Sequence, residues 1–348
     1  MQLKSIIKQY KNALIDTHGK HLQPNQWQAL NALERCRTKQ SGELYVQCKH
    51  CAHTHWSPMS CGHRHCPQCQ NHEVNQWLDR QKQKLLPVDY FMVTFTLPAQ
   101  LRELTRRHQK TIYSIFFDCV KSTLKDFGLN PKKLDGEMGL TAVLHTHNRK
   151  LDYHPHIHVV IPGGGINPSR KQWKKLSGNY LFNAFALAKV FRARFLSALN
   201  HHHLGIPHGT PKQWVVNVIN VGKGLPALKY LSRYLYRGVI SEKNIIKNEN
   251  GRVTFKYINS TTKQTEYRTL KGEEFLYLIL RHVLPRGFRR VRDYGFLHAN
   301  AKTTLKLVQL ILHVKLEAIA ARPRAEFKCP HCQSSMVIRI ICHAERSG

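Results

Sequence analysis

Two histidines lie two positions apart in a stretch rich in β-branched residues. His156 and His158 alternate with Ile157, Val159 and Ile161. Because successive side chains of a strand point to opposite faces, the two imidazoles would project side by side while the aliphatic residues bury the other face. Such a pair suits one divalent metal ion with open positions left for a substrate. Hydrogen-bonded or solvent-facing histidines are the alternative, since the chain contains 23 histidines.

A later helical stretch carries two tyrosines one turn apart. Tyr230 and Tyr234 stand at positions i and i+4, which places them on one helical face, whereas Tyr236 points elsewhere. Spacing alone favours ordinary core or interface packing for such a pair.

Six cysteines crowd into the first fifth of the chain. Cys48 and Cys51 form one Cys-x-x-Cys pair, Cys66 and Cys69 form another, and 14 residues separate the pairs. This spacing is typical of a structural zinc ribbon, in which four thiolates surround the ion as a tetrahedron. We therefore expect zinc to be bound by these four residues, in a closed site without catalytic chemistry.

Further potential ligands surround and follow these pairs. Cys36, Cys61 and His65 either hold a second metal ion or are buried core residues. In the last twenty residues of the sequence, Cys329 and Cys332 form a third pair. Cys342-His343 could complete a second small zinc site with them.

Arginine and lysine residues recur in the later part of the chain. Together with Phe288 and Tyr294, they could follow a phosphate backbone and stack bases. A solvated helix face is the alternative for any single run. The residues predicted to contact DNA are Lys223, Arg233, Arg237, Arg286, Arg289, Arg290 and Arg292.

The composition supports a nucleic-acid partner. Lys and Arg number 54 against 21 Asp and Glu, giving a formal net charge of +33 at pH 7. So large a charge of one sign is self-repulsive and indicates a polyanionic partner. The apolar stretches are too short and too interrupted to span a membrane, and the first residues do not form a secretory signal. We expect a cytosolic protein, a compartment in which clustered cysteines are metal ligands rather than disulfides.

These residues fall on a regular order of elements. We expect strands over 89–97, 139–145, 156–162 and 214–221, and helices over 101–127, 180–200 and 225–237. The order strand, helix, strand, strand, helix, strand, helix is that of a split βαβ, ferredoxin-like α+β fold with one added helix. A helix pair over 1–35 precedes it, and a hairpin over 253–270 and helices over 273–284 and 299–321 follow.

Several motifs together resemble a known family. The His156-Ile157-His158 strand followed by the Tyr-x-x-x-Tyr helix resembles the HUH endonuclease superfamily. The resemblance is closest to the rolling-circle, two-tyrosine insertion-sequence transposases of the IS91 type, which carry an N-terminal zinc-binding domain. It extends from about residue 29 to 312, through the motifs RHCPxCQ (64–70), YFxVTFTLP (90–98), HVLPxGF (282–288) and YGF (294–296).

The resemblance implies metal-dependent nicking and joining of single-stranded DNA at the ends of an insertion sequence. Tyr230 or Tyr234 would attack a backbone phosphate, giving a 5′-phosphotyrosine and a free 3′-hydroxyl. His156 and His158 would hold Mg²⁺ or Mn²⁺. For the third ligand of such sites, His154 on the same strand face is preferred over His145 on the neighbouring strand. The protein would act in the bacterial cytoplasm, associated with the nucleoid.

The expected organisation has four parts. Residues 1–85 form a helical, cysteine-rich zinc-binding domain, 86–240 an HUH nuclease core, 241–322 a basic, largely helical DNA-binding region, and 323–348 a second zinc knuckle. Two other functions fit the same residues. One is a plasmid relaxase or replication initiator with the same core, and the other is a decayed transposase that binds DNA through a zinc ribbon without cutting.

Overall fold

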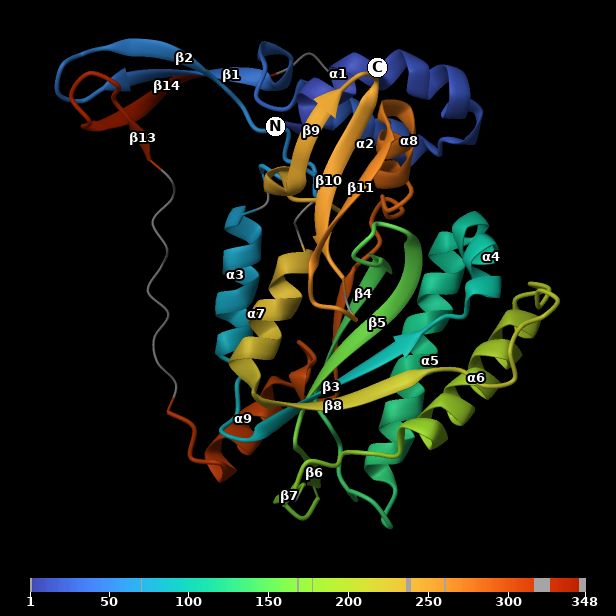
Figure 1. Cartoon of the computed structure of the whole chain (residues 1–348). Coiled ribbons are helices and arrows are strands. Elements are labelled where there is room, and N and C mark those ends of the chain that lie inside the picture. The colour runs from blue at the N-terminus through green and yellow to red at the C-terminus, as the bar shows by residue number, and fades with distance from the viewer. Residues whose placement is uncertain are drawn as a thin grey trace. The chain divides into compact units, whose positions relative to one another are not determined.

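Figure 1 shows the computed structural model of the chain, which describes residues 2–69, 71–167, 169–176, 178–235, 239–259, 261–315 and 326–343. The side chains of residues 71, 72, 230 and 233–235 are not described. The chain forms two compact units. The first comprises Met1–His72, Tyr236–Val283 and Ala318–Gly348, and the second comprises Glu73–Leu235 and Leu284–Glu317.

A five-stranded antiparallel sheet forms the centre of the second unit. Its order is β12 (Val291–Tyr294), β4 (Leu140–His147), β5 (Tyr153–Pro162), β3 (Asp89–Thr96) and β8 (Val216–Lys223). The four longer strands lie where the sequence predicts them, whereas the short edge strand β12 is not apparent from hydrophobic pattern. Together with its helices, this sheet gives the unit the expected mixed α+β character.

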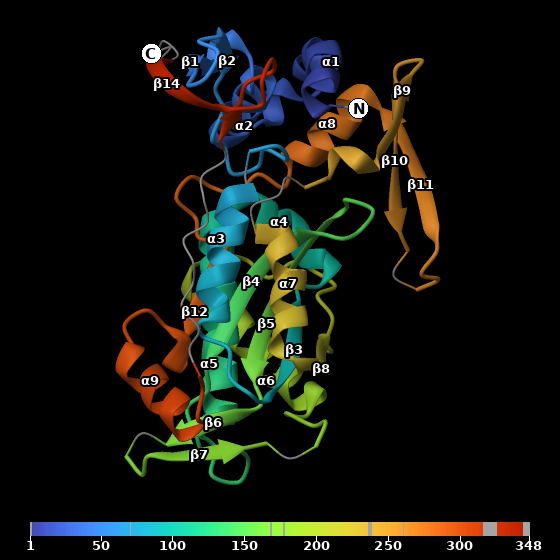
Figure 2. The ribbon, with the colours of Figure 1, turned by 90° about the vertical axis from the view of Figure 1, so that its left-hand side faces the viewer.

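Helices cover both faces of this sheet. In Figures 1 and 2, α5 (Gln109–Leu129) and α6 (Ala184–His201) lie on one side, and α3 (Asn71–Lys82) and α7 (Gly224–Leu235) lie on the other. Helix α7 contacts β3, β4, β5 and β8. Because both faces are covered, every residue of β4 except its last is buried.

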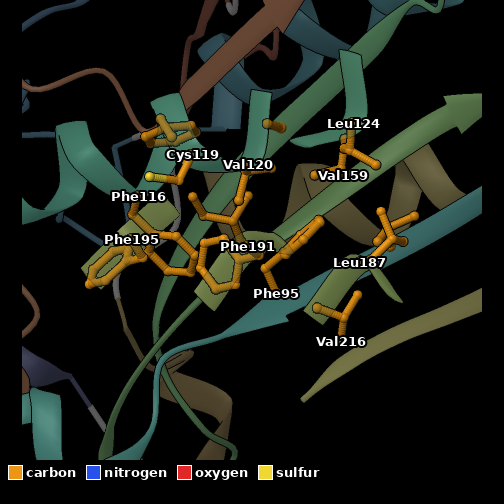
Figure 3. Close-up of a cluster of buried hydrophobic side chains, with 14 of the residues drawn as sticks. Phe95, Phe116, Cys119, Val120, Leu124, Val159, Leu187, Phe191, Phe195 and Val216 are labelled. Atoms are coloured by element: carbon orange, nitrogen blue, oxygen red, sulfur yellow. The ribbon is translucent and has the colours of Figure 1, made fainter. Parts of the chain in front are cut away.

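The main hydrophobic core lies between the sheet and helices α5 and α6 (Figure 3). Phe116, Val120 and Leu124 recur every four residues along α5, so one stripe of that helix faces the sheet. Phe191 of α6 is fully buried, and its ring lies 5.0 Å from that of Phe95 on β3. The alternation predicted for β5 is confirmed, since Ile157, Val159 and Ile161 all belong to this core.

The remaining elements of this unit are short. A helix expected over 101–127 is divided at His108 into α4 (Arg102–Arg107) and α5, because the backbone of His108 leaves the helical region with ψ 42°. Strands β6 (Gly164–Asn167) and β7 (Gln172–Lys175) pair as a separate two-stranded sheet. The expected last helix is shorter than predicted: α9 spans Lys302–Ile311, and residues 316–325 lie outside the described parts of the chain.

The first unit contains three packed helices and a three-stranded sheet. Helices α1 (Leu3–His18), α2 (Pro24–Arg35) and α8 (Gly272–Leu280) contact one another. Strand β10 (Arg252–Ile258) lies between β9 (Ile245–Glu249) and β11 (Thr265–Lys271), which confirms the predicted hairpin and adds β9. Phe255 of β10 packs against Phe275 of α8, so a basic segment of the later chain belongs to the same unit as the N-terminal helices.

A four-stranded antiparallel sheet completes this unit. Its order is β13 (Phe327–Lys328), β14 (Ser335–His343), β1 (Gly42–Cys48) and β2 (Thr54–Pro58). Strands β1 and β14 pair from Gly42 opposite His343 to Cys48 opposite Met336, so segments from both ends of the sequence share one sheet. Among the described helices of both units, none combines the length and the apolar character that crossing a bilayer requires.

Candidate functional site

Three histidines gather on the central sheet of the second unit. His145 of β4 and His156 and His158 of β5 each offer a ring nitrogen, and these three atoms lie within 4.8 Å of one another. The pairing register explains the cluster, because His145 lies directly opposite His156 and its ring is 4.5 Å from that of His158. The sequence therefore predicts two members of this group.

The third member differs from the one preferred from the sequence. His154 shares a strand face with His156, but the structure does not bring it into the group. Arg102 donates from Nη2 to His154 Nδ1 at 2.9 Å. Since a guanidinium has no acceptor, that nitrogen must accept and the ring proton of neutral His154 sits on Nε2. His145 takes the third place because the β4–β5 register sets it directly opposite His156.

Hydrogen bonds orient two of the clustered imidazoles. His156 Nδ1 donates to the backbone carbonyl of His154 at 2.6 Å, which leaves Nε2 with its lone pair available. His158 Nδ1 lies 2.8 Å from Thr94 Oγ1 of β3. Partners of this kind fix the ring orientation and tautomer of metal-binding histidines. Thr94 is a site residue that sequence pattern does not single out.

Burial keeps the cluster uncharged. Desolvation lowers the pKa of His156 to about 4 and the pKa of His158 to about 3. Desolvation also lowers the pKa of His145 well below its ordinary value, and the neighbouring His158 and His156 imidazoles lower it further. Neutral imidazole is the form that binds a metal ion. The three donors are thus chemically suited to one divalent transition-metal ion.

Helix α7 packs on the sheet face that carries these histidines. Ile157 and Val159 point into the core under α5 and α6, so His156 and His158, which alternate with them, point to the opposite face. Helix α7 lies on that opposite face (Figure 2) and buries Leu228 and Leu231.

The predicted nucleophiles belong to this helix. Helix α7 contains Tyr230 and Tyr234, whose side chains are not described. It also contains Arg233, one of the predicted DNA contacts, whose side chain is likewise not described. The described residues do not include Tyr236 and Arg237.

The cysteines form two groups of four in the first unit. The first contains Cys36, Cys61, Cys66 and Cys69, with Cys36 Sγ 3.5 Å from Cys66 Sγ and 3.3 Å from Cys69 Sγ. The second contains Cys48, Cys51, Cys329 and Cys332. In a zinc tetrahedron with bonds of about 2.3 Å, neighbouring sulfurs are about 3.8 Å apart, so these separations suit zinc.

The grouping expected from the sequence is therefore wrong, although every expected cysteine except Cys342 belongs to one of the two groups. The pair Cys66 and Cys69 is completed by Cys36 and Cys61, not by Cys48 and Cys51. His65 is buried, and it is not one of the four members of the first group. Cys342 is exposed opposite Glu43 and does not join Cys329 and Cys332. Local spacing identifies each Cys-x-x-Cys pair but carries no information about which other cysteines complete its site.

The predicted DNA-contacting residues have different environments. Arg286 and Arg289 are exposed. Lys223 is exposed and pairs with Asp89 at 3.0 Å. The Arg292 guanidinium lies over the Phe117 ring at 4.3 Å, so part of its side chain packs inside the unit. Arg290 lies near the histidine cluster and contributes to the lowered pKa of His145.

Comparison with known proteins assigns the chain to a family. Residues 6–97 match the family described as "Transposase zinc-binding domain", and residues 139–304 match the family described as "Putative transposase". A transposase of Sinorhizobium fredii, "Putative transposase y4qJ", is 32% identical over 331 residues, which cover 88% of this chain and 83% of that protein.

Two further similarities were found. The "Transposase for insertion sequence element IS801" of Pseudomonas savastanoi pv. phaseolicola is 25% identical over 283 residues, covering 75% of this chain and 68% of that protein. A solved bacterial tRNA(His) guanylyltransferase-like protein in complex with ATP is 12% identical, covers 61% of this chain and 98% of its own, and has a TM-score of 0.22, too low to indicate a shared fold. On the family matches and the relative in Sinorhizobium fredii, this chain belongs to the IS91 family of Y2 transposases and carries that family's zinc-binding domain.

Proposed function

We propose that this transposase nicks and rejoins single-stranded DNA at the ends of its insertion sequence through a tyrosine of α7 and a divalent ion held by His145, His156 and His158. One observation carries the proposal. The helix that contains Tyr230 and Tyr234 packs on the sheet face from which the buried histidines project. A candidate metal site and the helix that carries a pair of potential nucleophiles therefore lie on the same side of the sheet.

The architecture supports an HUH nuclease core. The chain order β3, α5, β4, β5, α6, β8, α7 matches the order expected for that core, and all neighbouring strands are antiparallel. His156 and His158 occupy the central strand β5, where hydrogen bonds on both edges hold the backbone rigid. Rigid placement matters because catalytic groups must be held close to the reactive geometry.

The donor set fits a divalent ion, and the ion would have one role. When bound, it would polarise the scissile phosphate and offset the charge that develops on its oxygens. Thr94 orients His158, and the backbone carbonyl of His154 orients His156. Arg102, beside the cluster through His154, would add positive charge where a phosphate is to be bound.

The proposed chemistry is a transesterification. The tyrosine oxygen forms a bond to phosphorus, the bond between phosphorus and the 3′ oxygen breaks, and the phenol proton is exchanged for one on the released 3′-hydroxyl. The resulting 5′-phosphotyrosine keeps the phosphoester bond energy, so a 3′-hydroxyl can later attack it and rejoin the strand without ATP. With two tyrosines, one could hold a DNA end while the other cuts.

The test is covalent capture of DNA. Oligonucleotides from the single-stranded ends of the element are incubated with the full chain and Mn²⁺ or Mg²⁺, then denatured and separated. We expect an adduct on the 5′ end that the break creates and a released fragment whose 3′-hydroxyl a polymerase extends. Tyr230→Phe/Tyr234→Phe should abolish the adduct, and Tyr236→Phe should keep it. Tight binding without an adduct would instead support a DNA-binding protein that does not cut.

A further inference from the structure

We propose that Cys48, Cys51, Cys329 and Cys332 bind a second zinc ion, and that this ion holds residues 326–343 to the N-terminal hairpin. We call the resulting four-stranded module the composite ribbon: β1 and β2 with the Cys48–Cys51 turn, and β13 and β14 with the Cys329–Cys332 turn. Cys51 and Cys329 are 278 positions apart, and the second pair lies outside the region that matches the zinc-binding family. The inference does not depend on the proposed nuclease activity.

The two turns have the same backbone design. The amide of Cys48 donates to the carbonyl of His53 at 2.8 Å, and the amide of Cys329 donates to the carbonyl of Ser334 at 2.9 Å, five residues onward in each case. The residue before each acceptor adopts a positive φ, 55° at Ala52 and 60° at Gln333. Two matched hairpin turns, each presenting two thiols, are what a zinc ribbon requires.

The thiol positions fit a metal ion rather than disulfides. Cys48 Sγ lies 3.5 Å from Cys332 Sγ, and Cys51 Sγ lies 3.6 Å from both Cys329 Sγ and Cys332 Sγ. A disulfide would need about 2.05 Å, whereas neighbouring ligands around zinc are about 3.8 Å apart. The amides of His50 and Cys51 also donate to Cys48 Sγ, which stabilises a thiolate at that position.

Among the described residues, this sheet has only a small hydrophobic core. Its hydrophobic core consists of Val46, Cys48, Cys329 and Met336, so two of its four buried residues are the proposed ligands. On β14, Ile338 and Ile340 remain about half exposed. A core this small does not normally fold alone, and small domains of this kind take their folding free energy from metal binding. A metal ion that closes a long loop also restricts the unfolded chain most strongly.

The composite ribbon has a consequence for how the protein is made. During synthesis, Cys48 and Cys51 lack their partners, and β1 lacks its neighbour β14, until residue 332 and the following strand have been translated. The first cysteine group has no such delay, because Cys36, Cys61, Cys66 and Cys69 all lie within 34 residues. The two zinc sites should therefore form at different times and be separable by mutation.

Native mass spectrometry combined with cysteine alkylation tests the inference on the full chain. All chains compared carry His156→Ala/His158→Ala, so that the histidine cluster holds no zinc, and the chain with its cysteines intact, called wild type in this test, should carry two zinc ions. Cys329→Ser/Cys332→Ser should carry one, and its Cys48 and Cys51 should become reactive toward N-ethylmaleimide while the first group stays protected. The matched control Cys342→Ser, which changes an exposed cysteine of β14, should keep two ions. Protection of Cys119 reports that the second unit of the variant is folded, and protection of the first cysteine group reports the same for the first unit.

Three results would overturn the inference: one zinc ion in wild type, two in Cys329→Ser/Cys332→Ser, or continued protection of Cys48 and Cys51 in that variant. If Cys119 becomes reactive, the variant is unfolded. The inference is then tested on the wild-type protein. Its zinc is then withdrawn stepwise with a mercurial, and the peptides that become labelled together are identified. Labelling of Cys48 with Cys329 supports the composite ribbon, and labelling of Cys48 with Cys66 contradicts it.

Discussion

His145 and His156 lie directly opposite each other on adjacent strands, with ring centroids 5.1 Å apart. This cross-strand pair, extended by His158, forms the three-nitrogen cluster, whereas His154 is held by Arg102. We therefore predict that His145→Ala lowers the rate of adduct formation by about 100-fold or more, since a lost ligand should cost at least as much as a lost outer partner. His154→Ala, the matched control, should lose less than about 10-fold. The reverse order would restore His154 as the third ligand.

Thr94 is predicted to act by positioning His158. Thr94→Val keeps the shape of the side chain but removes the hydroxyl 2.8 Å from His158 Nδ1. Affinity for Mn²⁺, measured by isothermal titration, should fall about 10- to 100-fold. Thr94→Ser retains the hydroxyl and should bind within a few-fold of wild type. A loss of affinity in Thr94→Ser but not in Thr94→Val would show that the methyl packing matters and the hydrogen bond does not.

The donor set also predicts a preference among metal ions. Three imidazole nitrogens suit a transition-metal ion better than Mg²⁺, which prefers oxygen ligands and gives up its water reluctantly. Adduct formation should therefore reach half of its maximum at a lower concentration of Mn²⁺ than of Mg²⁺. A requirement for Mg²⁺ with Mn²⁺ inactive would show that oxygen ligands outside the cluster dominate the site.

Acid should destabilise the metal-free second unit through the same histidines. The folded pKa of His156 is about 4, below the ordinary value of 6.5, so the unfolded chain binds more protons between these two values and stability falls as the pH drops through that window. Each such histidine contributes up to about 1.4 kcal/mol per pH unit. Between pH 7 and 5.5, the urea midpoint should fall less in His156→Ala than in wild type or in His298→Ala, which alters an exposed histidine. Equal slopes would contradict the burial of a neutral His156.

The core between the sheet and helices α5 and α6 should tolerate little loss of volume. Phe191 is fully buried among Phe95, Phe116 and Trp214. Phe191→Ala should destabilise the unit by about 3–5 kcal/mol in urea unfolding. Phe185→Ala, on the same helix at 66% exposure, should change stability by less than about 0.5 kcal/mol. Similar losses in both variants would place α6 differently on the sheet.

The alternation of residues along a strand and the spacing of cysteines predict the local parts of these sites. They do not predict which distant segments pair. The alternation on β5, with His156 and His158 on one face and Ile157 on the other, requires only that the segment be a strand. The place of His145 depends on the register between two strands, which an irregularity between His145 and His147 alters. In the same way, each Cys-x-x-Cys pair is visible locally, whereas the meeting of Cys51 with Cys329 depends on the fold of the residues between them.

The position of the covalent bond to DNA is the most direct test of the proposed cleavage mechanism. Adducts formed with single-stranded element ends in Mn²⁺ are digested with nuclease and protease, and the modified peptide is sequenced by mass spectrometry. We predict a nucleotide linked through its 5′ phosphate to Tyr230 or Tyr234, and none when His145 is replaced by Ala. A nucleotide on Tyr236 or on another residue, or an adduct that forms equally well without the histidine cluster, would contradict the proposed site.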